Sequence, residues 1–466
     1  MRIQFLGAVR SVTGAKHRLE IAGKSILLDC GLFQGRRQDF FDRNQRFEFR
    51  PAGVDTVLLS HAHIDHSGNI PTLVREGFAV HVYATPATVD LCSAMLRDSA
   101  HVLAADVAYV NKKRARKGEP PLKPLYSLDD ALAAVEHFLG VGYNRPIPLA
   151  NGATATFRDA GHILGSAMVE IAVREDGHTR KVVYSGDLGR PNLPILRDPY
   201  VVQDVDALIL ESTYGDRTHE SPADAEERLQ RVILDTVRRG GKVIIPAFAV
   251  GRTQELVYAL HRLTLAGKLP ELPVFVDSPL AVNVTEIFRL HPECYDREIN
   301  AFIERADVED AFGFRRLRYV RDVDESKALN ALKEPAVIIS ASGMCEAGRI
   351  LHHLKNNIED PRNTILFVGY QAEQTLGRKL VDGWKQVKIF GEEYTVRAAV
   401  ERIDGYSAHA DRDELLDYVR WVQQTGLRRV FVVHGEEQSS LSLADAIREL
   451  GVPEVHVPTP GETVEL

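Results

Sequence analysis

Hydrophobic and polar residues follow one another with two different rhythms along the chain. As far as about residue 210, short β-rich apolar runs are separated by Gly-rich turns, and helical patterns occur at 70–76, 87–110 and 128–138. From about residue 212 to 395, an apolar run, a Gly-containing loop and a helix alternate repeatedly. The first rhythm predicts stacked sheets, and the second predicts a parallel, doubly wound sheet.

The loops in the second pattern are candidate binding sites, because ligands of doubly wound sheets bind beyond the carboxyl ends of the strands. A Gly-containing loop that opens a helix presents free N–H groups, which can hold a phosphate. The candidate phosphodiester contacts are Gly251, Arg252, Ser342 and Gly343, with Arg349 and Arg378 further along the helices. Packing alone also explains such turns. The sequence has no Walker loop or dinucleotide fingerprint, so no nucleotide cofactor is expected.

In the first part, a run of metal-ligating residue types follows the apolar segment 57–59. His61, His63, Asp65 and His66 supply four ligands within six residues. In an extended turn His61 and His63 point the same way and can hold one cation, while the other two can face a second. A polar loop that is rich in histidine by chance is the alternative. Converging imidazoles and a carboxylate are costly to pack without a cation, which favours a metal site.

Further ligand types stand where other apolar runs end. His162 lies between glycines, and Asp187 and His434 each follow a strand-like run. Each of them alone is as well explained by a turn or a helix cap. Together with the first run they give three His and one Asp for one cation. Asp65, His66 and His434 then surround another, and Asp187 can bridge the two.

Composition sets limits on the class of protein. With 466 residues, of which 44% are hydrophobic and 26% charged, the chain can bury two substantial cores. The first residues read as a strand rather than a signal peptide, and no apolar run is long enough for a membrane span. Four widely spaced cysteines indicate free thiols in a reducing cytoplasm, and neither a disulfide framework nor a zinc knuckle. The expected location is therefore cytoplasmic.

A basic run stands out against the net charge of −8. It consists of Lys112, Lys113, Arg114, Arg116 and Lys117, and it lies in an insertion at about 97–145. A protein that is acidic overall can still line one groove with cations and bind phosphates there. A solvated surface explains the run equally well. We expect it to lie in loops near the metal-binding face and to contact substrate.

The ligand run resembles the signature His-x-His-x-Asp-His of the metallo-β-lactamase superfamily. Other positions resemble its β-CASP nucleases, the group that contains the endonuclease subunit of the cleavage and polyadenylation specificity factor and ribonuclease J. Asp29 matches the first motif, Glu211 matches motif A, His409 matches motif B and His434 matches motif C, where the RNA-processing branch carries histidine. The resemblance extends from residue 1 to about residue 460.

This resemblance implies an α/β fold. The metallo-β-lactamase αββα sandwich would comprise residues 1–210 and 398–466, with a Rossmann-like β-CASP domain of parallel strands inserted at 211–397. Asp29 would orient ligands from behind. Asp65, Glu211 and His409 would be catalytic, with His409 as proton donor and Glu211 as the residue that orients it.

The activity that the resemblance implies is hydrolysis of RNA, in which two cations lower the pKa of a shared water. The products would carry a 3′-hydroxyl and a 5′-phosphate. Imidazole-rich ligation favours two Zn²⁺, with Mn²⁺ as the alternative. Single-stranded RNA is the expected partner, no membrane is expected, and a homo-oligomer is left open. Endonucleolytic attack is preferred to 5′-exonucleolytic attack.

Four alternatives stay open on the sequence alone. They are a small-ester or thioester hydrolase of the same superfamily, a DNA-directed relative, a catalytically inactive RNA-binding scaffold, and a structural protein with incidental metal. The insertion and the Glu211 and His409 pair disfavour the first, and His434 disfavours the second. The intact set of ligands disfavours the last two.

Overall fold

The computed structural model describes residues 1–35, 37–175, 177–305, 308, 310–369, 371 and 374–466, and they form two compact units. Unit 1 comprises residues 1–192, 197–218 and 409–466, and unit 2 comprises residues 193–196 and 219–408. Unit 1 is therefore assembled from both ends of the chain, whereas unit 2 comes mainly from its middle.

Unit 1 contains two sheets of seven strands each among the described residues. The first has the order β22-β1-β2-β3-β4-β5-β6, formed by Thr463–Glu465, Arg2–Gly7, Lys16–Ile21, Lys24–Leu28, Thr56–Leu58, Val82–Ala84 and Phe138–Gly140. The second has the order β21-β20-β11-β10-β9-β8-β7, formed by Glu454–His456, Arg429–Val433, Ala207–Glu211, His178–Tyr184, Ala167–Glu175, Ala153–Asp159 and Pro146–Ala150.

Each sheet is antiparallel in one half and parallel in the other. In the first, β3 through β6 run parallel, and in the second, β10, β11, β20 and β21 do so. The carboxyl ends of parallel strands lie at the same edge of a sheet. The loops after β3 and β4 are therefore neighbours, as are the loops after β10, β11 and β20.

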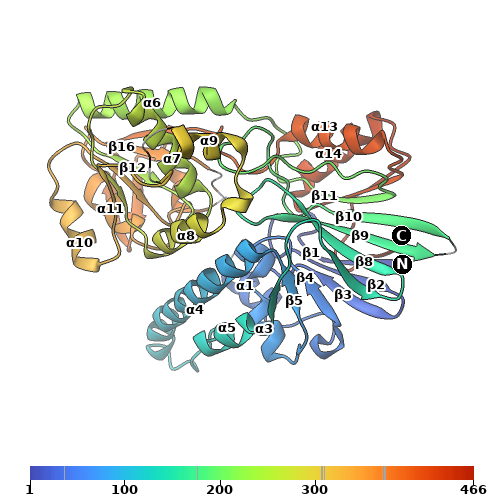
Figure 1. Ribbon diagram of the computed structural model, residues 1–466. Coiled ribbons are helices and arrows are strands. Elements are labelled where there is room, and N and C mark those ends of the chain that lie inside the picture. The colour runs from blue at the N-terminus through green and yellow to red at the C-terminus, as the bar shows by residue number, and fades with distance from the viewer. Residues whose placement is uncertain (36, 176, 306–307, 309, 370, 372–373) are drawn as a thin grey trace. The chain divides into compact units, whose positions relative to one another are not determined.

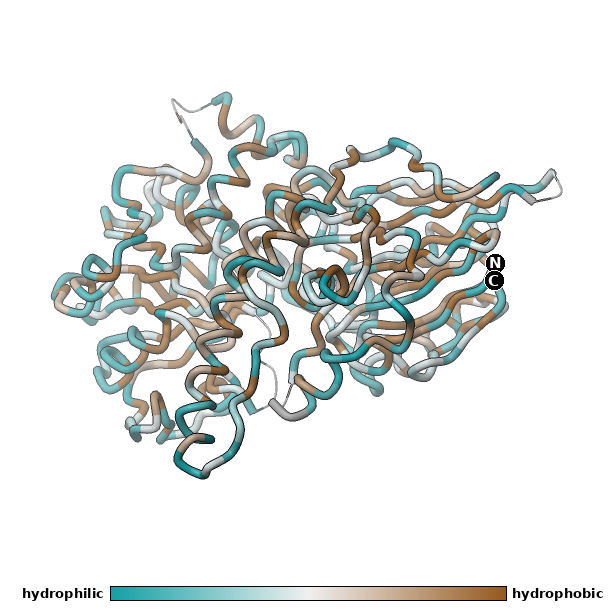
Figure 2. The backbone as a smooth tube through the Cα atoms, turned by 90° about the horizontal axis from the view of Figure 1, so that it is seen from below, coloured by the Kyte–Doolittle hydropathy of each residue, from teal (hydrophilic) through white to brown (hydrophobic). Residues whose placement is uncertain are grey.

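The core of unit 1 has two layers of buried side chains. One layer lies between the sheets and joins Phe5 and Leu58 of the first to Phe157, Ile209 and Phe431 of the second. The other lies between the second sheet and the helices α13 (Arg412–Gln423) and α14 (Glu437–Glu449), drawn in red in Figure 1. Figure 2 shows hydrophobic residues recurring along the strands and hydrophilic ones gathered at the turns.

The remaining helices of unit 1 belong to its N-terminal half. They are α1 (Arg37–Asn44), the short 3-10 helix η1 (Pro51–Gly53), α2 (Ile64–Ser67), α3 (Ile70–Arg75), α4 (Pro86–Ala115) and α5 (Leu128–Val135). Local sequence explains where two of them begin. Thr85 caps α4 and is followed by Pro86, and Ser127 forms a capping box with Asp130 at α5.

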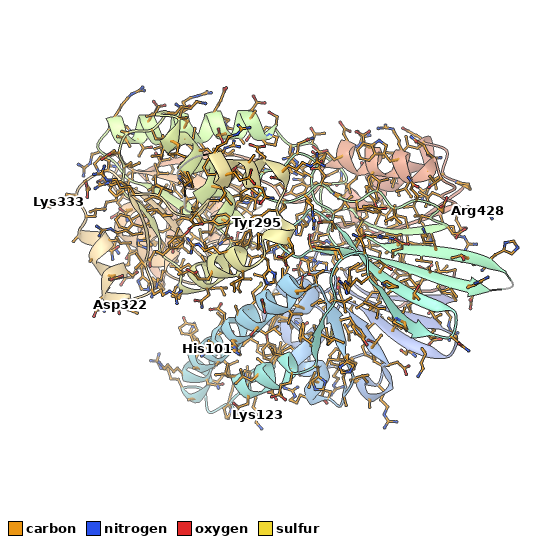
Figure 3. The ribbon with its side chains drawn as sticks, viewed as in Figure 1. His101, Lys123, Tyr295, Asp322, Lys333 and Arg428 are labelled. Carbon is orange, nitrogen blue, oxygen red and sulfur yellow. The ribbon has the colours of Figure 1, made fainter. Side chains whose placement is uncertain are left out.

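Two predictions in this region need correction. The helix expected at 128–138 ends at Val135, because residues 138–140 pair in parallel with β5 as the edge strand β6. Lys112, Lys113 and Arg114 lie in the last turn of α4 rather than in a loop. Figure 3 shows the side chains that project from α4 and from the segment after it, with His101 and Lys123 labelled; both are exposed.

Unit 2 is built on a parallel sheet, as the second rhythm predicts. Its six strands among the described residues have the order β14-β13-β15-β12-β16-β19, formed by Leu317–Tyr319, Val274–Val276, Val337–Ser340, Val243–Pro246, Thr364–Phe367 and Ala399–Arg402. All the pairings in this sheet are parallel. A hairpin of β17 (Gln386–Ile389) and β18 (Glu392–Thr395) adds a smaller sheet.

Helices pack on the parallel sheet, and Figure 1 shows β12 and β16 among them. They are α6 (Pro222–Arg238), α7 (Arg252–Leu265), α8 (Pro279–Leu290), α9 (Arg297–Arg305), α10 (Val323–Ala328), α11 (Ile350–Asn357) and α12 (Leu376–Val381), with the 3-10 helices η2 (Pro292–Cys294) and η3 (Leu329–Ala331). One buried cluster joins Ile338 and Phe367 of the sheet to Ile350, Leu380 and Val387.

Strand β19 lies beyond residue 397, where the sequence places the end of the insertion. It belongs to the parallel sheet because Ala399–Arg402 pairs with β16, and unit 2 accordingly continues to residue 408. The bounds 211–397 of the inserted β-CASP domain stay a prediction.

The structure describes the state of the cysteines and the character of the helices. All four cysteines, Cys30, Cys92, Cys294 and Cys345, are buried, and none of them forms a disulfide bond. Within the part of the chain that the structure describes, no helix is both long and apolar enough to cross a lipid bilayer.

Candidate metal centre

The predicted ligands of unit 1 all stand on loops or helix starts at strand ends. His61 follows β4, His63 caps α2, and Asp65 and His66 lie in that helix. His162, Asp187 and His434 follow β8, β10 and β20, and Asp29 follows β3. Tight packing holds these loops together, because a Cβ on Gly31 would lie only 1.5 Å from the Asp65 carbonyl oxygen. The topology thus brings residues that are far apart in sequence to one place.

The first group of ligand atoms has spacings that suit a tetrahedral cation. His63 Nδ1 lies 3.1 Å from His61 Nε2 and 3.2 Å from His162 Nε2. Asp187 Oδ2 lies 3.3 Å from His61 Nε2 and 3.4 Å from His162 Nε2. A tetrahedron with metal–ligand bonds of ~2.05 Å has edges of ~3.3 Å. These side chains therefore fit a zinc ion.

The second group consists of Asp65, His66 and His434. His66 Nε2 lies 3.0 Å from His434 Nε2, and His434 Nε2 lies 3.6 Å from Asp65 Oδ2. Asp187 Oδ1 faces this group, at 3.2 Å from His66 Nε2, while Oδ2 faces the first. Asp187 Oδ1 is buried and accepts no hydrogen bond from the described residues. The carboxylate thus lies between two sets of ligands, as a bridging group would.

Asp29 fixes the orientation of His66, a member of this second group, through a hydrogen bond to the ring nitrogen that does not face the other ligands. It is fully buried and accepts hydrogen bonds from Ser60 N and Ser60 Oγ at 2.7 Å, Tyr184 OH at 2.8 Å and His66 Nδ1 at 2.7 Å. Because His66 Nδ1 is engaged in this way, Nε2 is the ring nitrogen that faces the second group. His61 is arranged alike, with Nδ1 3.0 Å from Ser60 Oγ.

Ser60 and Tyr184 are functional residues that the motifs did not identify. Ser60 immediately precedes the histidine run, which is a signal that could have found it. Tyr184 is the last residue of β10, three positions before Asp187, but only the packing of the two sheets brings its hydroxyl to Asp29.

Electrostatics divides the imidazoles into two classes. Burial, together with the neighbouring imidazole of His61, lowers the pKa of His63 to about 3. Burial also lowers the pKa of His61, and it holds the pKa of His162 well below the usual range. Burial opposes a charge on His66 as well, but Asp187 and Asp29 outweigh it and raise its pKa well above the usual value. The three imidazoles of the first group are therefore neutral and free to ligate.

Beside the ligands lies the pair of Glu211 and His409. Glu211 ends β11 and is fully buried, and its oxygens accept hydrogen bonds from Leu188 N at 2.7 Å and Thr213 N at 3.2 Å. His409 Nδ1 lies 3.0 Å from Glu211 Oε1 and 3.9 Å from Asp187 Oδ2. Burial disfavours a charged ring, yet these two carboxylates raise the pKa of His409 to about 9. His409 therefore carries a proton at neutral pH.

The candidate phosphodiester contacts lie in unit 2, and some of them already have other partners. Arg252 is buried and forms an ion pair with Glu255. Arg349 donates to Asp277 Oδ1 at 2.7 Å and to the carbonyl of Arg321. Arg252 Nε has no hydrogen-bond partner among the described residues. The role of both arginines as phosphate contacts stays a prediction.

The other candidate phosphate contacts in unit 2 are Arg378, Gly251, Ser342 and Gly343. Arg378 forms a half-exposed pair with Asp382 at 2.8 Å. Gly251 precedes α7 with a φ of 76°, and Ser342 Oγ accepts a hydrogen bond from Glu346 N. Gly343 is buried against Phe248, where a Cβ would lie 3.0 Å from the ring. Ser342 N itself donates to Ala347 O at 3.2 Å, and the role of these loops as phosphate contacts stays a prediction.

The basic run of unit 1 forms the exposed end of α4. Four of its members are exposed, and Arg114 is partly buried because it pairs with Glu119 at 3.0 Å. Lys113 lies 4.5 Å from the ring centre of Tyr109, which is 55% exposed. An exposed aromatic ring beside cations suits stacking of a base and binding of a phosphate.

Three family models match, described as Metallo-beta-lactamase superfamily for residues 19–247, Beta-Casp domain for residues 253–380, and Zn-dependent metallo-hydrolase RNA specificity domain for residues 393–458. A solved structure from Enterococcus faecalis V583, described as a protein of unknown function, has a TM-score of 0.56 at 14% identity and covers 100% of this chain and 99% of its own. It supports the fold alone.

Curated relatives match over nearly the whole chain. Ribonuclease TTHA0252 of Thermus thermophilus is 39% identical over 95% of both chains. The RNase J-like protein of Methanocaldococcus jannaschii is 32% identical over 97% of this chain and 96% of its own. Transcription termination factor FttA of Methanosarcina mazei is 33% identical over 100% of this chain and 72% of its own. The chain therefore belongs to the β-CASP family of metallo-β-lactamase-fold RNA-processing nucleases.

Proposed function

We propose that the protein is a ribonuclease that uses two Zn²⁺ to hydrolyse RNA phosphodiesters and leaves a 3′-hydroxyl and a 5′-phosphate. The observation that carries this proposal is the position of Asp187, whose two oxygens face two separate groups of ligands. Two cations that share a carboxylate form the arrangement that two-metal hydrolases use. RNA as substrate is supported by the RNA specificity domain and by the name of the Thermus relative.

The side chains assigned to each cation follow from the distances. His61, His63, His162 and Asp187 hold one, and Asp65, His66, His434 and Asp187 hold the other. Imidazole-rich ligation favours zinc, with manganese as the alternative. When bound, such a pair supplies a water of lowered pKa and stabilises charge on the phosphate oxygens. Asp29, Ser60 and Tyr184 fix the tautomers on which this ligation depends.

His409 is the proposed donor of the proton that the leaving 3′-oxygen needs. Its proton is available at neutral pH because Glu211 and Asp187 raise its pKa to about 9. Glu211 is a positioning residue, since its oxygens are fixed by backbone N–H groups and face His409 Nδ1. This leaves His409 Nε2 as the ring nitrogen that can donate to substrate.

Contacts to the rest of the RNA are proposed in each unit separately. In unit 2, Gly251, Arg252, Ser342 and Gly343 keep the role of phosphate contacts, and Arg349 and Arg378 are weaker candidates. In unit 1, the basic run at the end of α4 is proposed to bind the strand without regard to sequence. Contacts to phosphate position a strand, whereas contacts to bases select it.

An experiment with end-labelled, single-stranded RNA tests the proposal. Metal-loaded protein is incubated with otherwise identical RNAs that carry a 5′-hydroxyl or a 5′-monophosphate. We expect internal fragments from both, which indicates endonuclease action. Mononucleotides released from the 5′-monophosphate RNA alone would indicate a 5′-exonuclease instead. Intact RNA with protein that retains two metals would refute the proposal and favour an inactive RNA-binding scaffold.

A further inference from the structure

The loop between β12 and α7 in unit 2 presents one exposed ring within a buried stretch. Phe248 is 37% exposed, whereas the residues on either side of it, Ala247 and Ala249, are at most 8% exposed. A single exposed hydrophobic side chain needs no explanation by itself. The position of this one is informative, because it follows β12 at the carboxyl end of the parallel sheet, where ligands of such sheets bind.

Hydrogen bonds fix the backbone of Phe248 on both sides. Ala247 N donates to Ser340 O at 3.1 Å, which continues the pairing of β12 with β15. The carbonyl oxygen of Phe248 accepts from Thr253 N at 3.3 Å and from Thr253 Oγ1 at 2.7 Å. The residue is therefore tied to the sheet and to the first turn of α7, and its ring stands on a fixed backbone.

The Phe248 ring contacts the loop after β15 and approaches the loop after β16. A Cβ on Gly343 would lie 3.0 Å from Cδ2 and 3.1 Å from Cε2 of the ring, and a Cβ on Gly369 would lie 3.9 Å from Cε2. Strands β15, β12 and β16 are neighbours in the sheet, so their loops meet at this ring. One side of the ring is thus covered by glycine backbone, and the residue still keeps more than a third of its surface exposed.

The loop after β15 has hydrogen-bond donors that its own fold does not use. Ser342 N donates to Ala347 O at 3.2 Å, and Cys345 N donates to Ser342 O at 3.2 Å. Gly343 N and Met344 N donate to no acceptor among the residues that the structure describes. Gly343 is buried, and a buried N–H without an acceptor costs free energy unless a ligand or a water accepts from it. Two successive N–H groups of this kind suit a phosphate oxygen.

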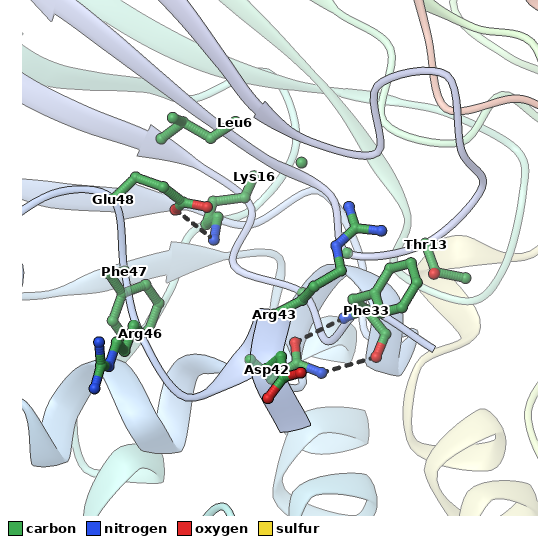
Figure 4. Close-up of a pocket in the computed structure, with 13 residues that line it drawn as sticks. Leu6, Thr13, Lys16, Phe33, Asp42, Arg43, Arg46, Phe47 and Glu48 are labelled. Carbon is green, nitrogen blue, oxygen red and sulfur yellow. Dashed lines mark hydrogen bonds and ion pairs between the residues drawn. The ribbon is translucent and has the colours of Figure 1, made fainter. Parts of the chain in front are cut away.

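A pocket in the N-terminal part of unit 1 lacks such convergence. Its volume is about 310 Å³, and cationic and aromatic side chains line it. Figure 4 shows Arg46 and Phe47 across the hollow from Arg43, with the two guanidinium groups pointing away from each other. No single ligand is therefore indicated there, whereas Phe248 touches the very residue that bears a spare donor.

We propose that Phe248 stacks an unpaired base of the RNA substrate, next to a phosphate that the N–H groups of Gly343 and Met344 hold. Every base has a π-face, so a stack on the ring holds a strand without reading its sequence. A base within a duplex is already stacked on its neighbours, and the ring therefore selects unpaired RNA. The inference rests on the proposed ribonuclease function and adds a contact to a base in unit 2.

The test measures RNA affinity of metal-loaded protein by fluorescence anisotropy. The probe is a short, labelled, single-stranded RNA with phosphorothioate linkages, which keep the charge and slow hydrolysis. Otherwise identical probes carry an abasic site at one position after another, which removes one base and keeps every phosphate. Phe248→Leu removes the ring, and Phe248→Tyr keeps it. The matched control is Phe390→Leu, which removes an exposed ring of the same unit between β17 and β18.

In the parent, one abasic position is expected to weaken binding about tenfold, because the stack is lost with the base. Phe248→Leu should weaken binding of the intact probe by about the same factor and should be insensitive to that abasic position. Its salt slope of log K should stay parental, since no phosphate contact is lost. Phe248→Tyr and Phe390→Leu should bind as the parent does. Metal content and hydrolysis of bis(p-nitrophenyl) phosphate should stay at parental values in all variants.

Phe248→Trp supplies a readout that does not depend on a loss of affinity. A base that stacks on an indole ring quenches its fluorescence. The emission that this variant adds to that of the two native tryptophans, Trp384 and Trp421, should therefore fall when the intact probe binds. It should stay unchanged with the probe that is abasic at the sensitive position. This variant decides the matter if Phe248→Leu loses metal or unfolds.

Three outcomes would overturn the proposal. Phe248→Leu with the affinity of the control, or with an equal loss on every abasic probe, would show that the ring only covers the glycine loop. Phe248→Trp that binds RNA without quenching would refute the stack as well. In both cases a parent that binds and cuts RNA leaves the proposed function standing. A parent that neither binds nor cuts RNA would refute the function together with the stack.

Discussion

Replacing His409 by alanine tests proton donation separately from metal binding. The imidazole lies 3.0 Å from Glu211 Oε1 and 3.9 Å from Asp187 Oδ2. It belongs to neither of the two proposed ligand groups, although with Asp187 and Glu211 it forms a third candidate group. His409→Ala should therefore retain both metals and full RNA affinity. What it removes is a proton donor beside the leaving oxygen.

The size of the defect follows from general acid catalysis and from the charge state of the ring. With a pKa of about 9, His409 is protonated at neutral pH. At pH 7.5 a pKa of ~9 gives ~30 charged rings for each neutral one. A positioned acid contributes ~10²–10⁴-fold, so cleavage should slow by that factor, or about 3–5 kcal/mol in activation free energy.

The sign of the pH dependence also follows. The charged form of His409 donates, so kcat/KM of the parent should fall as pH rises through about 9. Glu211→Gln removes the carboxylate that contributes most to raising the pKa of His409, and the fall should move to lower pH. In His409→Ala this basic limb should be absent.

The assay compares two RNAs that differ in one atom. One has an ordinary 3′-oxygen at the scissile bond, and the other has sulfur there, which leaves as a thiolate and needs little acid help. The His409→Ala defect should largely disappear on the sulfur substrate. His137→Ala, which removes a partly exposed imidazole bonded to Val80 O, is the control and should cleave both at parental rates. An undiminished defect on sulfur, or loss of metal with the imidazole, would reassign His409 to positioning or ligation.

Three further predictions concern the metals, the basic run and the residues behind the ligands. Purified protein should contain two metal ions per chain by mass-spectrometric analysis and lose RNA cleavage on chelation; active protein with only background metal would contradict this. Neutralising the basic run should weaken RNA binding and its salt dependence while sparing hydrolysis of a small phosphodiester, and an unchanged salt slope would mark a solvated surface. The run comprises Lys112, Lys113, Arg114, Arg116 and Lys117. Tyr184→Phe should weaken metal affinity by about tenfold through Asp29, because it removes one of the hydrogen bonds that orient the ligands. Tyr418→Phe, which removes a buried hydroxyl bonded to Tyr200 O, should leave metal affinity unchanged.

The sequence predicts the fold class and the ligand set because both depend on local order. Asp187 and His434 follow strands of the second sheet, where the carboxyl ends of parallel strands share an edge. His61 follows β4 of the first sheet, so the pattern indicates the ligands and the packing of the two sheets brings them together. The parallel sheet of unit 2 follows from its repeated rhythm.

Features that depend on distant partners could not be predicted. Arg349 pairs with Asp277, 72 residues away, a contact that the local sequence does not indicate. Tyr184 reaches Asp29, 155 residues away, only because two sheets pack face to face. The helical pattern at 128–138 extends into an edge strand because tertiary pairing of residues 138–140 overrides local propensity. In each case a contact between elements decides what the local pattern leaves open.

The most direct test of the account is the fate of solvent oxygen during cleavage. RNA is digested by metal-loaded protein in ¹⁸O-labelled water, and the ends of the products are analysed by mass spectrometry. If water attacks the phosphate and the 3′-oxygen leaves, one ¹⁸O should appear in each new 5′-phosphate, opposite an unlabelled 3′-hydroxyl. Unlabelled products with 2′,3′-cyclic phosphates and 5′-hydroxyls would show attack by the ribose hydroxyl and contradict the account.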